Sequence, residues 1–355
     1  MPDIFELMGA TVQQSASDLH LQVGRRPVLR IHGGLTEVET GEILTAEDTE
    51  SLVRQFTPER NLAELLETGT TDFGYAFQDK GRFRVSALRQ KNAFGLIMRL
   101  IPTQLMTFDE IGLPDAVVDL LSRPRGLVLV TGPTGSGKTT TLATMIDWIN
   151  RNRDCHIVTI EDPIEFYHHH QKANVIQREA GNDVPSFSEA MRRVLRQDPD
   201  VILLGEMRDL ETTSAAITAA ETGHLVFGTL HTTGSARTVD RIIDQYPTNQ
   251  QEQIRAQLAV SIVAVLSQVL LPRADRKGRI AAFEIMYMNS AIENHIRKAE
   301  TFKINSAIQT SKRQGMVTLD DYLRELVEDG KITPKVAIEA SQEPREMEKR
   351  LLGEG

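Results

Sequence analysis

The sequence predicts an α/β protein with an antiparallel sheet near its N-terminus, a mostly parallel sheet after it and helices at its C-terminus. Two observations indicate this class. In the first hundred residues apolar and polar residues alternate over short stretches, which is typical of strands with one buried face. From about Asp115, short and nearly continuous apolar runs alternate with helical patterns, as in parallel sheets covered on both faces.

Composition and charge narrow the functional classes. The 355 residues carry a net charge of −9, which argues against a dedicated nucleic-acid binder. Cys155 is the only cysteine, so neither a disulfide framework nor a tetracysteine zinc site can form. The N-terminal MPDIFELMGA has no apolar core of a secretory signal, and no apolar run approaches the ~18 residues of a membrane span. We therefore expect a cytoplasmic chain without a transmembrane segment.

The first hundred residues predict a β-rich domain with helices. DLHLQV (18–23) and PVLRIHGGL (27–35) flank a Gly-Arg-Arg turn and predict a hairpin. A helical pattern over 45–66 is broken by Pro58. Alternating residues in 73–77 and 83–87, followed by the run FGLIMRLI, complete an antiparallel meander that turns at QDKG.

The second region predicts buried parallel strands. Four apolar runs indicate them: GLVLVT (126–131), HIVTIE (156–161), VILLGE (201–206) and HLVFGTL (224–230). Ser186, with Glu189 three residues later, predicts a helix start. Another helix is expected from Asp209 to Gly223.

The C-terminal residues predict helices. Ser290 and Glu293 form a capping-box pattern, and Gly330 is expected to end a later helix. That helix has apolar residues at i, i+3, i+4 and i+7, namely Leu319, Tyr322, Leu323 and Leu326. The charged tail SQEPREMEKRLLGEG is expected to be loose.

GPTGSGKT (132–139) is the strongest motif in the chain. It follows an apolar strand and precedes a helical run, which is the context of a P-loop. Glycines let the backbone amides turn towards phosphates at a helix N-terminus. Lys138 would reach the β- and γ-phosphates of ATP, and the Thr139 hydroxyl would bind Mg²⁺. The expected nucleotide-binding residues are Gly132, Thr134, Gly135, Ser136, Gly137, Lys138, Thr139 and Thr140.

An acidic residue ends the strand VILLGE, downstream of the P-loop. Glu206 is the candidate to hold Mg²⁺, directly or through water, or to polarise the attacking water. The alternative is a strand-end carboxylate that pairs with Arg208. The P-loop favours the functional interpretation.

The stretch TIEDPIEFYHHH (159–170) follows the next buried strand. Because its carboxyl end faces the same crevice, Glu161, Asp162 and Glu165 are candidates to activate water or hold Mg²⁺. A zinc site at His168–His170 is the rival. Three adjacent side chains cannot all point one way, so we expect a solvated loop instead.

Two histidines flank the strand HLVFGTL. His231 follows it, on the side of the crevice, and is a candidate to sense the γ-phosphate by hydrogen bonding. His224 stands at its start, where a capping or core role is the ordinary interpretation.

Together, GPTGSGKT, TIEDPIEF, LLGEMRDLET and GHLVFGTLHT resemble the Walker A, Asp box, Walker B and His box of the secretion-superfamily ATPases. Within that superfamily the chain is most similar to the ATPases that retract type IV pili. It lacks the tetracysteine motif usual in assembly and type II secretion ATPases, and its N-terminal part is short. AIENHIRK (291–298) also resembles the AIRNLIRE motif of retraction ATPases, departing from it at Glu293 and His295.

The resemblance implies site residues and an assembly. Glu165 resembles the catalytic glutamate, Glu206 the Walker B glutamate, and His224 and His231 the two His-box residues. Three further arginines resemble those that reach the phosphates: Arg84, Arg99 and Arg241. Asp162 is left a structural role. The implied assembly is a homo-hexamer that hydrolyses ATP to retract pili and drive twitching motility. It would act on an inner-membrane pilus platform protein, with no nucleic acid as partner.

The resemblance also implies the domain order. We expect a PAS-like α+β domain over 1–101, a linker over 102–114 and a RecA-like core over 115–272. A helical region over 273–344 and a tail over 345–355 follow. Three alternatives stay open: an accessory or assembly-side paralogue, an ATP-binding regulatory module with little turnover, and a nucleic-acid motor.

Overall fold

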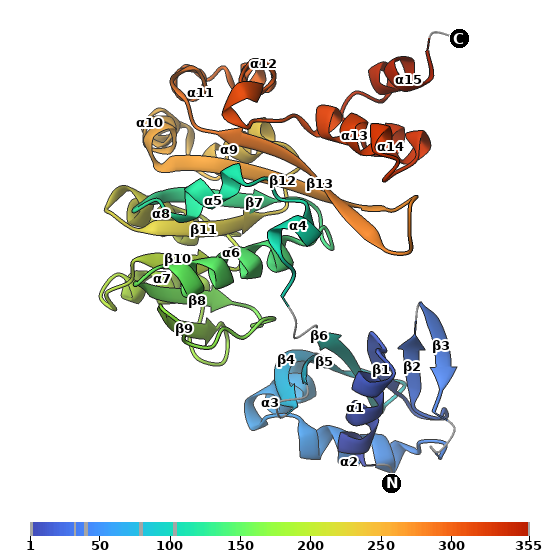
Figure 1. Cartoon of the computed structure of the whole chain (residues 1–355). Coiled ribbons are helices and arrows are strands. Elements are labelled where there is room, and N and C mark those ends of the chain that lie inside the picture. The colour runs from blue at the N-terminus through green and yellow to red at the C-terminus, as the bar shows by residue number, and fades with distance from the viewer. Residues whose placement is uncertain (1–2, 32, 39–41, 78–80, 102–104, 354–355) are drawn as a thin grey trace. The chain divides into compact units, whose positions relative to one another are not determined.

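The structure is a computed structural model that describes residues 3–31, 33–38, 42–77, 81–101 and 105–353 (Figure 1). By its contacts the chain divides into two units. The first takes in residues 1–104 and, from later in the chain, residues 163–167. The second takes in residues 105–162 and 168–355. No helix among the described residues is long and apolar enough to cross a membrane.

The first unit contains an antiparallel sheet of six strands in the order β3-β2-β1-β6-β5-β4 (Figure 1). The strands are β1 (Asp18–Leu21), β2 (Val28–Ile31), β3 (Gly34–Glu37), β4 (Thr70–Phe77), β5 (Gly81–Gln90) and β6 (Ala93–Ile101). The expected hairpin is β1–β2, and the expected meander is β4–β5–β6. The turn expected at QDKG falls largely outside the described residues.

The described part of this unit also contains the helices α1 (Ile4–Gln13), α2 (Ala46–Phe56) and α3 (Glu59–Thr68). The expected break at Pro58 is confirmed, because Pro58 stands between α2 and α3. The core joins alternate residues of the strands, such as Phe83 and Val85, to apolar residues of the helices, such as Leu52. The PAS-like character of this unit stays a prediction.

The second unit contains a seven-stranded sheet in the order β13-β12-β7-β11-β10-β8-β9 (Figure 1). The strands are β7 (Gly126–Thr131), β8 (His156–Glu161), β9 (Asn174–Glu179), β10 (Val201–Leu204), β11 (Leu225–Leu230), β12 (Ile262–Pro272) and β13 (Arg279–Tyr287). Neighbouring strands are parallel except for the β12–β13 pair. The four apolar runs therefore form parallel strands, as their composition predicted.

Helices cover both faces of this sheet, so successive strand residues enter different cores. Leu127 and Leu129 of β7 belong to one core, and Val128 and Val130 belong to the other. The first core includes α7 (Phe187–Val194), α8 (Leu210–Glu221), α9 (Ser235–Ile243), α10 (Gln251–Ser261), α11 (Ser290–Arg297) and α12 (Ile304–Thr310). The second includes α4 (Phe108–Ile111), α5 (Ala116–Leu121) and α6 (Lys138–Asn152). Three 3₁₀ turns, Thr248–Gln250, Thr301–Lys303 and Lys312–Gln314, lie between these elements.

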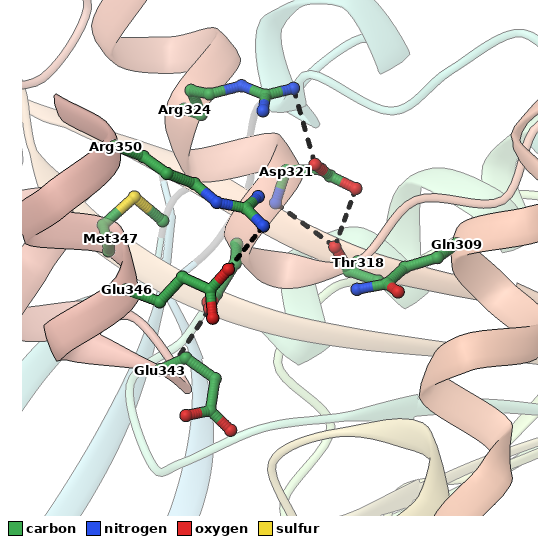
Figure 2. Close-up of a pocket in the computed structure, with 9 residues that line it drawn as sticks. Gln309, Thr318, Asp321, Arg324, Glu343, Glu346, Met347 and Arg350 are labelled. Atoms are coloured by element: carbon green, nitrogen blue, oxygen red, sulfur yellow. Dashed lines mark hydrogen bonds and ion pairs between the residues drawn. The ribbon is translucent and has the colours of Figure 1, made fainter.

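The last three helices, α13 (Leu319–Glu328), α14 (Pro334–Ala340) and α15 (Pro344–Leu352), pack on β12 and β13 through a smaller apolar cluster. A charged pocket opens where α13 and α15 meet. Figure 2 shows Arg350 paired with Glu346, and Arg324 paired with Asp321.

Several expectations about the chain's course need correction. The region 273–344 is not wholly helical, because it begins with strand β13. The tail is not loose throughout, since α15 forms and buries Met347. The expected linker contains α4, whose first turn has a complete capping box at Thr107. Helix α11 is capped by Asn289, one residue before the expected Ser290.

Other helix signals are confirmed. Ser186 accepts a hydrogen bond from the Glu189 amide at the start of α7. Asp209 caps α8 by accepting from the Thr212 amide, and Gly223 follows the end of that helix. Gly330 follows α13. These signals are local, so sequence alone could locate them.

Candidate active site

The P-loop turns between β7 and α6 with three glycines at positive φ. Gly132, Gly135 and Gly137 have φ of +141°, +79° and +91°. A Cβ on Gly132 would lie 2.1 Å from the Gln268 carbonyl oxygen, and one on Gly137 would lie 2.9 Å from Gln268 Nε2. The loop therefore requires glycine both for its backbone conformation and for its close approach to β12.

The loop leads into the N-terminus of α6, a helix of 15 residues. Its N-cap is Gly137, which offers no side chain to the first amides of the helix. The Ser136 hydroxyl is buried and has no hydrogen-bond partner among the described residues. Free amides, an unpartnered hydroxyl and the positive end of the helix dipole together suit a phosphate group.

Lys138 lies across the loop. Its Nζ donates hydrogen bonds to the carbonyl oxygens of Gly132, at 2.8 Å, and Pro133, at 3.1 Å. Burial lowers the pKa of Lys138, while the nearby Glu206 carboxylate raises it and opposes that effect. A bound phosphate would offer the ammonium group a charged acceptor in place of two neutral carbonyls, which makes a stronger bond.

Gln268 of β12 packs against the P-loop glycines Gly132 and Gly137. The sequence analysis did not predict this residue. It is 2% exposed, and its Oε1 accepts a hydrogen bond from Thr141 Oγ1 at 2.8 Å. The available signal was the polar pair Ser267–Gln268 within an otherwise apolar strand. Two polar residues facing two layers of core are expected to have partners there.

Glu206 lies two residues beyond the end of β10 and contacts residues on both sides. Its Oε1 lies 2.5 Å from Arg208 Nε and 3.0 Å from His231 Nε2. Burial raises the pKa of Glu206, but Arg208 and His231 outweigh it, so that the pKa lies below its usual value. The alternative of a salt bridge with Arg208 is therefore present, together with the contact to the His box.

The turn that carries Glu206 is fixed by close packing of strand ends. Thr229 Oγ1 donates to the Gly205 carbonyl at 2.5 Å, and the Met207 amide donates to the Thr229 carbonyl at 3.1 Å. A Cβ on Gly228 would lie 2.4 Å from Met207 Sδ. Glycine at 228 thus leaves the space that Met207 occupies, and Glu206 is held beside β11.

The two His-box histidines lie at opposite ends of strand β11. His231 follows the carboxyl end of β11, on the side of the sheet where the parallel strand β7 leads into the P-loop. His224 precedes β11, and its Nδ1 lies 3.0 Å from the Ala219 carbonyl oxygen. Because a strand residue advances about 3.3 Å, the six residues of β11 separate them by roughly 20 Å. The structure joins His231 to Glu206 and does not join His224 to them.

The Asp-box candidates differ in their surroundings. Glu161 is 7% exposed and accepts hydrogen bonds from Thr159 Oγ1 and Gln177 Nε2, at 2.6 and 3.2 Å. Its bonds suit a structural role. Asp162 is exposed, whereas Glu165 is half-buried in the segment 163–167, which belongs to the first unit.

The histidines of the following loop have separate environments. His168 has its pKa lowered to about 4 by burial, and His170 Nδ1 accepts a hydrogen bond from the Val175 amide at 3.1 Å. His169 is exposed. Within the described ranges, no cluster of three or more His, Cys, Asp or Glu residues is arranged to hold a metal.

Arg84 and Arg99 face each other across β5 and β6. Both are exposed, and Arg99 Nε donates to Asp18 Oδ1 at 2.9 Å. Burial raises the pKa of Asp18, but hydrogen bonds from Ser17 and Arg99 outweigh this effect and lower it. Asp18 stands opposite Arg99 on the neighbouring strand β1, so this carboxylate compensates the charge of Arg99 within the sheet. Arg241 is exposed in the last turn of α9.

The donors available for Mg²⁺ are oxygens, as this hard cation prefers. Thr139 stands in the first turn of α6, and Glu206 is a carboxylate whose lowered pKa keeps it ionised. These residue types fit the ion. Two protein ligands, with phosphate and water oxygens completing the shell, are usual for Mg²⁺ in nucleotide sites.

A phosphate-binding loop on a parallel sheet, with a strand-end glutamate beside it, defines a P-loop ATPase. The chain belongs to the family described as type II/IV secretion system protein, whose model matches residues 2–339.

Two curated relatives and one solved structure are closely similar to the chain. It is 45% identical to the type IV pilus retraction ATPase PilT of Pseudomonas aeruginosa, over 96% of this chain and 99% of that protein. It is 44% identical to a twitching motility protein of Neisseria gonorrhoeae, over 90% of this chain and 86% of that protein. A crystal structure of the pilus retraction motor PilT with bound ADP superposes with a TM-score of 0.92 at 42% identity, covering 98% of this chain and all of that one.

Proposed function

We propose that this chain is an ATP-hydrolysing motor that retracts type IV pili and so powers twitching motility. The observation that carries the proposal is the likeness to the PilT retraction ATPase, which extends over 96% of this chain and 99% of that protein. The P-loop and the Glu206–His231 contact support the proposal, because ATP hydrolysis needs a phosphate-binding loop with a carboxylate near it.

In the proposed mechanism the P-loop amides and Lys138 bind the phosphates of ATP. Phosphoryl transfer needs mainly positioning and charge stabilisation. Lys138 exchanges its bonds to the Gly132 and Pro133 carbonyls for phosphate oxygens. Thr139 and Glu206 would hold Mg²⁺, and the ion would neutralise negative charge on the phosphates. His231, hydrogen-bonded to Glu206, reports the γ-phosphate to α9.

The remaining site roles rest on the family resemblance. Glu165 is proposed as the residue that activates water. Arg84 and Arg99 are proposed to stabilise transition-state charge, and their placement on one face of the first unit supports this role. Arg241 is proposed to contact phosphate. We propose no catalytic role for His224, because it precedes the amino end of β11, whereas the P-loop follows the carboxyl end of the parallel strand β7.

The proposed assembly is a homo-hexamer in the cytoplasm that acts at the inner membrane through a pilus platform protein. Turnover is expected to depend on Lys138 and Glu206. Lys138→Ala or Glu206→Ala should reduce steady-state phosphate release by the purified ring at least about a hundredfold. Full activity in either variant would overturn the assignment of the site.

The direction of pilus movement needs a cellular experiment. Deleting the gene in a piliated source cell and counting surface pili by electron microscopy, with twitching scored alongside, tests the proposal. Many pili without twitching would support retraction. Bald cells would show an assembly role instead, and unchanged pili and motility would contradict a motor role in pilus movement.

A further inference from the structure

The N-terminus of α9 has an unusual cap. Its N-cap residue, Gly234, offers no side chain to the first turn. Instead, the Ser235 amide donates to Oε1 of Glu284 on β13, at 2.6 Å. The Gly234 amide donates to Ser267 Oγ on β12, at 2.8 Å. Two neighbouring strands thus supply the acceptors that a helix start normally finds in its own N-cap side chain.

Glu284 is buried, and both of its oxygens are occupied. The residue is 1% exposed, and its Oε2 accepts a hydrogen bond from Gln342 Nε2 at 3.0 Å. A buried carboxylate is costly unless hydrogen bonds compensate it. The positive end of the α9 dipole gives further stabilisation to its charge. The loss of either partner would therefore disturb the other bond.

His231 lies four residues before Ser235, on the short loop that leads into α9. Its Nε2 contacts Glu206 at 3.0 Å, and Thr232 Oγ1 lies 2.7 Å from Thr238 Oγ1 of α9. The loop is thus held at one end by the Walker B glutamate and at the other by Glu284 through Ser235. A shift of the helix start would move His231 relative to Glu206.

Gln342 connects this anchor to the C-terminal helices. Asp320, in α13, accepts from the Gln342 amide at 2.8 Å and from the Glu343 amide at 3.1 Å. Asp320 and Glu343 also line the charged pocket of Figure 2. The side chain that completes the Glu284 site therefore comes from a segment whose backbone is fixed by α13.

We propose that Glu284, held by Gln342, is a positioning residue that sets the distance of His231 from Glu206 and thereby the rate of ATP turnover. The proposal rests on the proposed role of His231 in sensing the γ-phosphate. It adds a contribution of the C-terminal helices to turnover, which neither the motifs nor the family likeness supplies.

The first test replaces charge while keeping shape. Glu284→Gln should lower the kcat for ATP hydrolysis by the full-length ring about tenfold, with KM for ATP little changed, because the P-loop is untouched. Gln342→Glu should also lower kcat, because two carboxylates would meet. The double variant restores an amide–carboxylate pair and should recover most of the lost kcat. If only the melting temperature moves in these variants, the role is merely structural and the proposal is wrong.

A pH profile gives a second readout. In Gln342→Glu, two carboxylates at this distance share a proton more readily as the pH falls. Its kcat relative to the wild type should therefore rise as the pH falls. Gln309→Glu adds a carboxylate to the wall of the charged pocket, which Gln342 does not line, and should match the wild type at every pH. A ratio that stays flat for Gln342→Glu would contradict the proposal.

A third test asks whether Glu284 acts through His231. If it does, Glu284→Gln should lower kcat little further in a His231→Ala background. Additive losses would show independent action and overturn the inference. Failure of the proposed function is distinguishable, because it would appear as turnover that survives Lys138→Ala. If His231→Ala alone leaves kcat unchanged, the sensing role fails, and the inference fails with it.

Discussion

The two ends of the parallel strands differ. At their carboxyl ends, the P-loop follows β7, Glu206 follows β10 and His231 follows β11. At their amino ends, Asp200 precedes β10 and His224 precedes β11. There each polar side chain is engaged by nearby backbone: Asp200 accepts from the His156 amide at 2.8 Å, and His224 contacts the Ala219 carbonyl. At the carboxyl ends, by contrast, the side chains of Glu206 and His231 contact each other rather than the backbone.

This difference shows that a polar residue next to a buried strand indicates a binding site only when it is known which end of the strand it follows or precedes. In parallel sheets, ligands bind beyond the carboxyl ends of the strands. His224 and His231 flank one strand, yet only His231 lies on the side where ligands bind. Substitutions at the two ends of the strands should therefore separate activity from stability.

The largest contrast is expected between the two histidines. His231→Ala removes a hydrogen bond to the ionised Glu206 and should lower kcat roughly ten- to hundredfold. His224→Ala removes a bond to a backbone carbonyl and should lower the free energy of unfolding by about 1 kcal/mol, with kcat unchanged. Steady-state phosphate release and thermal melting of both variants measure the two effects. Equal losses of kcat would abolish the distinction between the two ends.

A second effect, on stability rather than on turnover, is expected from the packing that holds Glu206. Gly228→Ala would place a Cβ 2.4 Å from Met207 Sδ and should destabilise the protein by about 1–3 kcal/mol. Adding Met207→Ala removes the clash, so the double variant should lose less than the sum of the two single losses. Thermal melting of all three variants measures this coupling. Gly9→Ala, where a Cβ meets nothing within 4 Å, is the control and should not destabilise. Strict additivity would show that Met207 simply moves aside.

The smallest effect concerns pH. The folded-state pKa of Glu206 lies below its usual value, so its contribution to stability is present above the unfolded-state pKa of about 4.3 and is lost as the pH falls through the folded-state value. Arg208→Gln should reduce this contribution by a few tenths of a kcal/mol at pH 7, since Arg208 is largely exposed. The difference in melting temperature between the wild type and Arg208→Gln should vanish at acidic pH. A difference independent of pH would assign the effect to something other than the ion pair.

Sequence patterns located the elements whose signals are local. Buried runs such as 126–131 identified β7, β8, β10 and β11, whereas the parallel strands β9 and β12 were not predicted. Asp209 and Gly330 identified helix ends. Strand β13 was missed because Glu284 interrupts its apolar run, and the reason for a carboxylate there lies in Ser235, 49 residues away. Helix α15 was missed because it is mostly charged and buries only Met347.

The candidate site, like the secondary structure, could be predicted only where its residues are close together in the sequence. The P-loop is contiguous in the sequence, so GPTGSGKT located it directly. The Glu206–His231 contact joins residues from different strands, and Gln268 supports the loop from a strand 127 residues after its partner Thr141. Such pairings depend on the order of strands in the sheet, which no motif records. The segment 163–167 likewise belongs to the first unit through contacts that its sequence does not announce.

The alternation along β7 limits which changes of length the chain can tolerate. Leu127 and Leu129 point to one core and Val128 and Val130 to the other, and the P-loop begins directly after Thr131. Inserting a single residue in this strand would exchange the two cores and turn the phosphate loop towards the wrong layer. Side-chain substitutions of similar volume would be far milder. Homologous chains should therefore vary in residue type along this strand but keep its length, with insertions and deletions falling in loops.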